Sequence, residues 1–220
     1  MVKKNSKKIN SPKNDVIIQD KIRLKKNKYS DSIRVRDIRT SSLEIISYEI
    51  YLRGIPGSTA ELGVYRGDFA KYINFFFPDR KLYLFDTFSG FSEKDIEYEI
   101  QNKYSDGNQD FSDTSVELII NKMPFKDNII IKKGWFPKSA KDINDIFCFI
   151  NIDVDLYKPT YNALKFFYPK LSKGGYIFVH DFNFSLYTKG VREAVIKFCE
   201  EIDISYFPLT DACGSVVLMK

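Results

Sequence analysis

Apolar residues occur in two alternating spacings along most of the chain. Short apolar runs bounded by turn residues predict buried strands, and apolar residues three and four positions apart predict helices. The predicted strands begin near residue 58 and lie at 81–86, 128–132, 147–153, 176–181 and 214–220. The predicted helices lie at 41–54, in the segment that ends at Pro78, and at 115–123, 161–169 and 190–202. Strands apolar on both faces that alternate with helices predict an α/β fold, a mostly parallel sheet with helices on both faces.

Two local features refine this picture. Ser41 stands three residues before Glu44, the spacing of a capping box, and Gly54 follows the last apolar residue, so we expect the first helix to begin near Ser41. The one long connection runs from Asp86 to about Asp113. A connection of that length is usually a functional lid or a mobile segment, and residues 87–112 are the candidate lid.

The formal net charge of +5 is unevenly distributed. Residues 1–28 contain ten Lys or Arg and two Asp, a net of +8, which leaves about −3 for the remainder. This predicts a basic, flexible N-terminal arm at 1–28 and a single domain at 29–220. An RNA-binding role for the arm is the alternative. Since the arm lacks the interleaved aromatic residues that stack on bases, we expect no nucleic-acid partner.

Cysteine usage and hydropathy predict a cytoplasmic protein. The three cysteines, Cys148, Cys199 and Cys213, are widely spaced and form no CxxC pair, so neither a disulfide framework nor a cysteine zinc site is expected. No apolar stretch follows the N-terminal charges, and no run approaches the ~18 apolar residues of a membrane span. We therefore expect no signal peptide and no membrane span.

The residues that follow the first two predicted strands are typical of a nucleotide-type site. Ligands of doubly wound sheets bind beyond the carboxyl ends of the strands. Glu61, Gly63 and Gly67 follow the first strand, and Asp86 ends the second, where such folds place an acid on a ribose diol. The turn contains Tyr65 and lacks the third glycine of a pyrophosphate-binding turn. The pattern therefore favours S-adenosylmethionine, which has a ribose and an adenine but no phosphates, over NAD.

Acidic residues and the only histidine follow two later strands. Asp153 comes after the fourth strand, and His180 and Asp181 come after the fifth. If these strands are adjacent, the three side chains converge, and they suit a divalent cation or a general base with an orienting acid. For Asp155 we expect a local role, as the cap of the helix that starts near Tyr157.

Longer stretches of the chain resemble one enzyme family. They are "ELGVYRGDFA", "LYLFDTFSGF", "KKGWFP", "NIDVDLYKPTYNALKFFYPKLSKGGYIFVHDF" and "GVREAVIKFCEE". From about Ser41 to Lys220 the chain is similar to the macrocin O-methyltransferase (TylF-like) family, S-adenosylmethionine-dependent enzymes that methylate sugar hydroxyls. The resemblance implies a class I methyltransferase (Rossmann-like) fold, with a mostly parallel seven-stranded sheet and a C-terminal antiparallel hairpin. It also implies a magnesium-dependent mechanism.

The resemblance also implies roles for individual residues. Asp153 matches the family's metal-binding acid, and His180 and Asp181 fall where many members have two aspartates. His180 is therefore either a ligand, which would favour a metal such as Mn²⁺ over Mg²⁺, or a catalytic base beside the ligands Asp153 and Asp181. The expected cofactor-binding residues are Glu61, Gly63, Tyr65, Gly67, Asp86, Thr87, Gly134, Trp135 and Phe136.

The expected acceptor is a small molecule or glycan with vicinal hydroxyls, such as a surface polysaccharide, a nucleotide sugar or a glycosylated natural product. A homodimer is a further expectation by analogy with the family. Two other reactions stay open from the residues alone. One is methylation of a phenol or catechol, and the other is a metal-dependent glycosyl transfer that would use Asp153 and Asp155 as a D-x-D motif.

Overall fold

The computed structural model describes residues 37–184 and 188–220, and residues 37–220 form one compact unit. The basic arm predicted at 1–28 lies outside the described residues. Within the described ranges, no helix combines the length and the apolar character that crossing a membrane requires.

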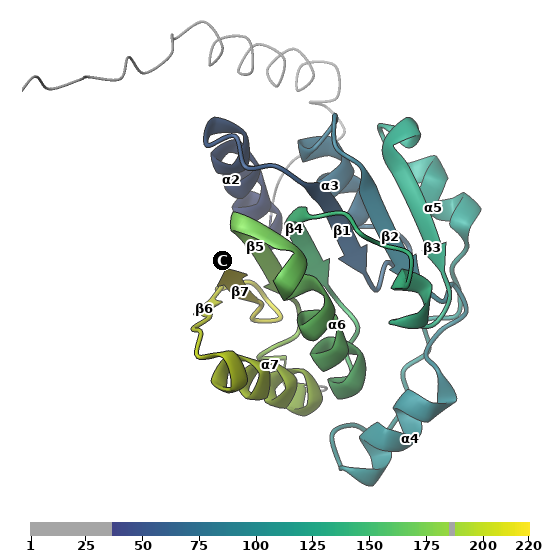
Figure 1. The fold of residues 1–220 in the computed structure, drawn as a ribbon. Helices are drawn as coiled ribbons and strands as arrows, with labels where there is room; N and C mark the ends of the chain where they lie inside the picture. Colours follow the sequence, from purple (N-terminus) through teal and green to yellow (C-terminus); the bar gives the residue numbers. More distant parts are fainter. Residues whose placement is uncertain (1–36, 185–187) are drawn as a thin grey trace, which may run out of the picture. The chain divides into compact units, whose positions relative to one another are not determined.

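A seven-stranded mixed sheet forms the centre of this unit (Figure 1). The strand order is β3-β2-β1-β4-β5-β7-β6. The first five strands pair in parallel, and β7 runs antiparallel to both β5 and β6. The strands are β1 (Ser58–Leu62), β2 (Leu82–Asp86), β3 (Ile129–Lys133), β4 (Phe147–Ile152), β5 (Leu171–Val179), β6 (Phe207–Pro208) and β7 (Val216–Met219). The predicted fold class is confirmed. From β1 the chain first adds β2 and β3 on one side and then β4 and β5 on the other, so the strand order reverses between β1 and β4. Such sheets bind ligands at this reversal.

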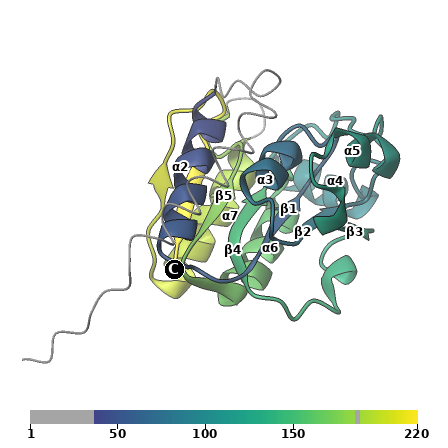
Figure 2. The same ribbon diagram turned by 90° about the horizontal axis from the view of Figure 1, so that it is seen from above.

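Helices cover both faces of the sheet, with α2 and α3 on one side and α6 and α7 on the other (Figure 2). Their bounds are α2 (Ile38–Leu52), α3 (Ala70–Phe76), α4 (Glu93–Gln101), α5 (Val116–Lys122), α6 (Tyr157–Lys170) and α7 (Thr188–Ile202). Two short 3₁₀ turns, Lys126–Asn128 and Lys138–Ala140, precede and follow β3. The predicted helices and strands are thus present. The sequence patterns missed α4 and β6, since α4 is only nine residues and mostly polar and β6 is two residues long.

Strand alternation decides which side chains reach each helical layer. Ala60 and Leu62 of β1 belong to the apolar cluster shared with α6 and α7. Successive side chains of a strand point to opposite faces, so Glu61 between them points toward α2 and α3. Glu61 is in register with Asn151 of β4, which is also fully buried. The face under α2 therefore contains a polar group within an otherwise apolar layer.

The start of α2 differs from the prediction. The helix begins at Ile38, and its N-cap is Asp37, four residues before the predicted cap Ser41. The Asp37 carboxylate accepts hydrogen bonds from the backbone N–H and the hydroxyl of Thr40, at 2.9 and 2.6 Å, and Ser41 donates its hydroxyl to the Asp37 carbonyl. Asp37 satisfies the first free amides, and Ser41 has no capping role. The additional turn brings Arg39 into the helix.

The predicted lid contains α4, which packs on the start of α6. A Glu99 carboxylate oxygen of α4 accepts the backbone N–H of Tyr157 at 2.8 Å. The predicted capping role of Asp155 is therefore wrong, because Glu99, 58 positions before Tyr157, accepts the first amide of α6. The rings of Tyr98 and Tyr104 lie 5.8 and 5.3 Å from that of Tyr157 and extend the contact.

The free energy of unfolding should depend on pH through Glu99. Its burial, together with the charge of Asp95, raises the pKa of Glu99 from the ordinary 4.5 to about 7. The folded state holds this proton more tightly than the unfolded state, so the contribution is present at low pH and is lost between about pH 4.5 and 7. We expect Glu99→Gln to gain stability relative to the parent protein as pH rises through this window. Urea unfolding at pH 5 and pH 8 measures the difference, with the exposed Glu97→Gln as control; parallel shifts in both variants would contradict it.

Candidate active site

A cavity of about 350 Å³ lies at the carboxyl ends of the central strands. It joins the ends of β1 and β2 to those of β4 and β5, at the reversal of strand order. The lid contributes Gly90, Phe91, Ser92, Asp95 and Phe111 to its wall. The predicted site residues that line it are Glu61, Gly63, Tyr65, Asp86, Thr87, Gly134, Trp135, Phe136, Asp153, His180 and Asp181. One cavity thus contains both groups of residues singled out in the sequence, apart from Gly67.

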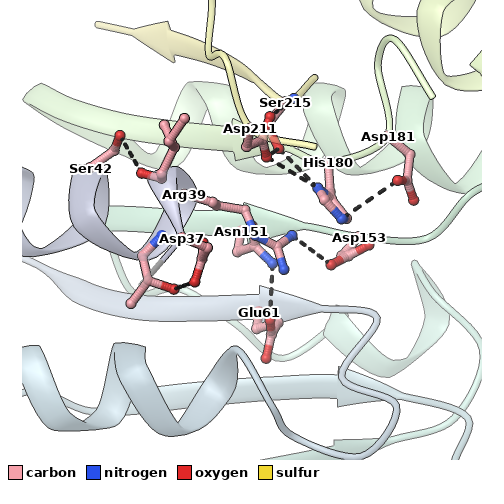
Figure 3. Close-up of polar contacts among 12 residues, drawn as sticks. Asp37, Arg39, Ser42, Glu61, Asn151, Asp153, His180, Asp181, Asp211 and Ser215 are labelled. Atoms are coloured by element: carbon pink, nitrogen blue, oxygen red, sulfur yellow. Dashed lines mark hydrogen bonds and ion pairs between the residues drawn. The ribbon is translucent and has the colours of Figure 1, made fainter. Parts of the chain in front are cut away.

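Glu61 is a buried acid with one unpaired oxygen at this cavity. Its Oε1 accepts the side-chain N–H of Asn151 at 2.9 Å, and its Oε2 is buried without a hydrogen-bond partner (Figure 3). Burial raises the pKa of Glu61 well above its usual range, and the charge of Asp153 adds to the effect. An unpaired carboxylate oxygen in this position is costly unless a cationic group meets it. It fits the ammonium group of the methionine part of the cofactor.

Two glycines of the turn after β1 serve packing. At Gly63 (φ +83°), a Cβ would lie 1.7 Å from the backbone oxygen of Asp153, so the approach of the two strand ends requires glycine there. At Gly67 (φ +76°), a Cβ would lie 3.2 Å from Ile119 of α5. The structure does not bring Gly67 to the cavity. Both glycines of the turn are therefore explained by close packing around them, and only Gly63 also lines the cavity.

Asp86 holds the same turn from the neighbouring strand. Its Oδ2 accepts the backbone N–H groups of Val64 and Tyr65 at 2.7 and 2.9 Å, and its Oδ1 accepts that of Phe88 at 2.7 Å. Tyr65 and Phe88 have φ of +48° and +55°, a strained conformation that such bonds maintain. A carboxylate oxygen has more than one acceptor direction, so binding of a ribose hydroxyl by Asp86 remains compatible with these bonds.

The predicted lid contacts the aromatic wall of the cavity. Trp135 donates its indole N–H to Asp95 of α4 at 2.7 Å. The ring of Phe111 lies 5.0 Å from that of Tyr65, edge to face. Asp113, just after the predicted lid, accepts hydrogen bonds from Tyr65 and Arg66. These contacts join residues 87–112 to the cofactor side of the cavity near both ends, and a lid function for the segment stays a prediction.

Trp135 is the only tryptophan, so its fluorescence should report cofactor binding directly. We expect S-adenosylhomocysteine to change the emission of Trp135 and to slow proteolytic cleavage within residues 87–112. Asp95→Asn should weaken the lid contact and make the segment easier to cleave, whereas Asp106→Asn, an exposed lid residue, should not. Equal cleavage with and without S-adenosylhomocysteine would contradict a lid.

Three carboxylates meet on the opposite side of the cavity. Ligand oxygens of Asp153, Asp155 and Asp181 all lie within 4.8 Å of one another. Burial, followed by a hydrogen bond with Asp181, raises the pKa of Asp155 well above its usual range. Asp155 and Asp181 both adopt left-handed backbone conformations, with φ of +55° and +56°. Asp155 therefore belongs to the cluster, and the local capping role expected for it gives way to the grouping with Asp153 that the D-x-D alternative had contained.

Arg39 is a second residue that the sequence did not identify. Its guanidinium donates to Asp153 Oδ2 at 2.9 Å and lies 4.1 Å from the ring centre of Phe69. Burial lowers the pKa of Arg39, but the charge and hydrogen bond of Asp153 raise it above the usual value, with a further contribution from Glu61. A positive charge thus stands between the cofactor side and the acidic cluster. No sequence signal marked it, since α2 was expected to begin after it.

His180 lies where the sequence predicted it, beside the end of β4. Its backbone N–H donates to the Ile152 carbonyl at 2.9 Å, which confirms that the fourth and fifth strands are adjacent. Its Nδ1 is 2.9 Å from Ser215 Oγ, and its Nε2 is 3.5 Å from Asp181 Oδ1. Cys213 lies within 4.8 Å of both His180 and Asp181. The hairpin residues near the C-terminus thus join the site, although no motif had pointed to them.

The strand order, the terminal antiparallel pair and a cavity beyond β1, β2 and β4 define a class I methyltransferase. The sequence profile of the macrocin O-methyltransferase (TylF) family matches residues 31–216, so the chain belongs to that family. It is therefore an S-adenosylmethionine-dependent O-methyltransferase, and the resemblance noted in the sequence is confirmed. Because the chain belongs to a methyltransferase family, its reaction is methyl transfer and not the metal-dependent glycosyl transfer that the D-x-D motif had left open.

Individual relatives are distant. A curated protein of Streptomyces olivaceus, 8-demethyl-8-(2,3-dimethoxy-alpha-L-rhamnosyl)-tetracenomycin-C 4'-O-methyltransferase, is 23% identical over 194 residues, covering 83% of this chain and 72% of the relative. The O-methyltransferase NovP superposes with a TM-score of 0.67 at 20% identity, over 83% of this chain and 79% of NovP. The calicheamicin methyltransferase CalS11 gives 0.65 at 16% identity, over 100% and 99% of the two chains.

Proposed function

We propose that this enzyme methylates a hydroxyl of a sugar-containing acceptor, assisted by a divalent cation. The observation that carries the proposal is the cavity itself, in which a wall suited to S-adenosylmethionine faces a cluster of three carboxylates. The names of two relatives agree with such an acceptor. The Streptomyces protein acts at the 4'-oxygen of a rhamnosyl group, and CalS11 is described as a TDP-rhamnose 3'-O-methyltransferase.

The cofactor would be held by residues of the first three strand ends. Glu61 Oε2 would meet the ammonium group, Asp86 a ribose hydroxyl, and Trp135 with Phe136 the adenine. S-adenosylmethionine supplies the methyl group, on a sulfonium that needs an oxygen nucleophile in line with the S–CH₃ bond. The lid residues Phe91 and Phe111 would exclude water from that line.

The donor set of the acidic cluster fits a divalent cation. Ligand oxygens of Asp153, Asp155 and Asp181 lie within 4.8 Å of one another, and a bound cation would neutralise the three carboxylates. A cation here would stabilise an alkoxide as it forms and so lower the pKa of a sugar hydroxyl. Two vicinal hydroxyls of the acceptor suit the remaining coordination positions, as in a surface polysaccharide, a nucleotide sugar or a glycosylated natural product.

An acceptor assay tests this proposal. The purified full chain, stripped of metal with EDTA, would be given S-adenosylmethionine and one of three probes, TDP-rhamnose, a UDP-hexose or a catechol, with and without Mg²⁺ or Mn²⁺. We expect metal-dependent methylation of a sugar probe. Methylation of the catechol alone would favour the phenol-type alternative, and sugar methylation that persists in EDTA would remove the cation from the proposal. We also propose a homodimer and a cytoplasmic location, which this assay does not test.

A further inference from the structure

A buried hydrogen-bond chain from the C-terminal hairpin ends on His180. Asp211 accepts the backbone N–H of Ser215 through Oδ1 and the Ser215 hydroxyl through Oδ2, both at 2.6 Å. Ser215 is fully buried, and its Oγ lies 2.9 Å from His180 Nδ1. Asp211 Oδ2 itself is 3.8 Å from the same nitrogen (Figure 3). Water does not reach Ser215, so these bonds alone fix the direction of its hydroxyl.

The direction of donation along these hydrogen bonds determines the tautomer of His180. A serine hydroxyl has one proton, and here it is donated to Asp211. The Asp211 carboxylate accepts from Ser215 through both of its oxygens, so it offers this hydroxyl only acceptor atoms. Toward His180, Ser215 Oγ is therefore left with lone pairs, and Nδ1 must supply the proton. In a neutral imidazole the lone pair then lies on Nε2.

The free nitrogen lies beside Asp181, one of the three carboxylates of the acidic cluster. Nε2 is 3.5 Å from Asp181 Oδ1, and His180 lines the same cavity as Asp153 and Asp155. A lone pair and a carboxylate oxygen repel each other unless a cation or proton lies between them. We propose that Asp211 and Ser215 hold His180 as the Nδ1–H tautomer, so that Nε2 acts as the nitrogen ligand of the cation bound by the carboxylate cluster. This rests on the cation site of the proposed function and decides between the two roles left open for His180.

The consequence is a changed metal preference. Mg²⁺ prefers oxygen ligands, whereas imidazole favours first-row transition metals, in the order Mn²⁺ < Co²⁺ < Cu²⁺ with Zn²⁺ also strong. Histidine ligands usually donate their second ring N–H to a fixed acceptor, and loss of that acceptor lowers metal affinity by about 10- to 100-fold. Asp211 and Ser215 are positioning residues in this sense, and His180→Asp should shift the preference back toward Mg²⁺.

The single histidine makes the tautomer directly measurable. In the ¹⁵N-labelled full chain, a long-range ¹H–¹⁵N correlation spectrum contains one imidazole, and we expect Nδ1 to carry the proton. Adding Zn²⁺, a diamagnetic probe, should shift the Nε2 resonance while Nδ1 stays protonated. Titration calorimetry would then compare Zn²⁺ and Mg²⁺ affinity in the parent protein and in variants.

Matched variants separate positioning from folding. Ser215→Ala should lose the fixed tautomer and weaken Zn²⁺ binding by about 10- to 100-fold, while S-adenosylhomocysteine affinity is unchanged. Thr210→Ala, which removes an exposed hydroxyl of the same hairpin, should alter neither. If Ser215→Ala folds poorly, Asp211→Asn is the second variant. The tautomer itself is measured in the parent protein and requires no variant.

The outcomes are distinct. A proton on Nε2 in the metal-free parent would overturn the inference, and so would Zn²⁺ binding that depends on Asp153 but leaves the Nε2 resonance unmoved, since His180 would then act as a base. Failure of the parent protein to bind S-adenosylhomocysteine would instead defeat the proposed function, whatever the tautomer.

Discussion

An Asp153→Asn protein should bind S-adenosylhomocysteine and transfer almost no methyl group. Asparagine has the size of aspartate but no charge, and Asp153 supplies one of the three carboxylates of the cluster. Removing one preorganised electrostatic contact of this kind typically costs about 10²- to 10³-fold in turnover. The cofactor contacts proposed for Glu61, Asp86 and Trp135 come from the ends of other strands, so cofactor affinity should stay within a few-fold. Calorimetry with S-adenosylhomocysteine and a methyl-transfer assay on the same preparation give both quantities.

A second effect of this substitution must be separated from the first. Arg39 loses its ion-pair partner, and its side chain is only 16% exposed. A buried donor left with a weaker partner costs about 1–3 kcal/mol of stability. Arg39→Met combined with Asp153→Asn removes the unpaired charge and should recover part of the unfolding free energy without recovering activity. Recovery of activity in the double variant would mean that Asp153 acts only by restraining Arg39. Asp203→Asn, on an exposed residue after α7, controls for loss of a carboxylate elsewhere.

The sequence predicts most of this fold because the signals for it are local. Apolar runs such as 147–152 identify strands without knowledge of their neighbours, and residues that directly follow a strand necessarily lie at its end. The convergence of Asp153 with His180 and Asp181 needed one further assumption, that β4 and β5 pair, and the structure shows that pairing. Strand-end chemistry is therefore the part of a site that a single sequence predicts best.

Contacts made across long sequence separations had no such signal. Arg39 and Asp153 are 114 residues apart, and His180 and Ser215 are 35 apart, joined only by tertiary packing. The capping box at Ser41 failed for a related reason, because Asp37 accepts two hydrogen bonds from Thr40 and so starts the helix earlier. Residues that orient or neutralise a catalytic group are thus harder to predict than the group itself.

Glu61→Gln should bind the cofactor more weakly and yet fold more stably. Glutamine keeps an oxygen for the N–H of Asn151, but its amide replaces the unpaired Oε2 and offers an ammonium group no negative charge. Hydrogen bonds to charged groups contribute about 1.5–3 kcal/mol, so we expect affinity for S-adenosylhomocysteine to fall by about 10- to 100-fold. Titration calorimetry measures this loss, with Glu117→Gln, an exposed residue of α5, as the control.

The gain in stability follows from the same buried oxygen. Burial raises the pKa of Glu61, so the folded state binds its proton more tightly than the unfolded state does. Ionisation therefore destabilises the folded, cofactor-free protein increasingly as pH rises above the ordinary value of 4.5. Glutamine has no such ionisation, and the advantage of Glu61→Gln should be small at pH 4.5 and larger at pH 7.5 in urea unfolding. Weaker binding without a pH-dependent gain in stability would mean that Glu61 is already paired in the free protein, and that its open oxygen is not kept for the cofactor.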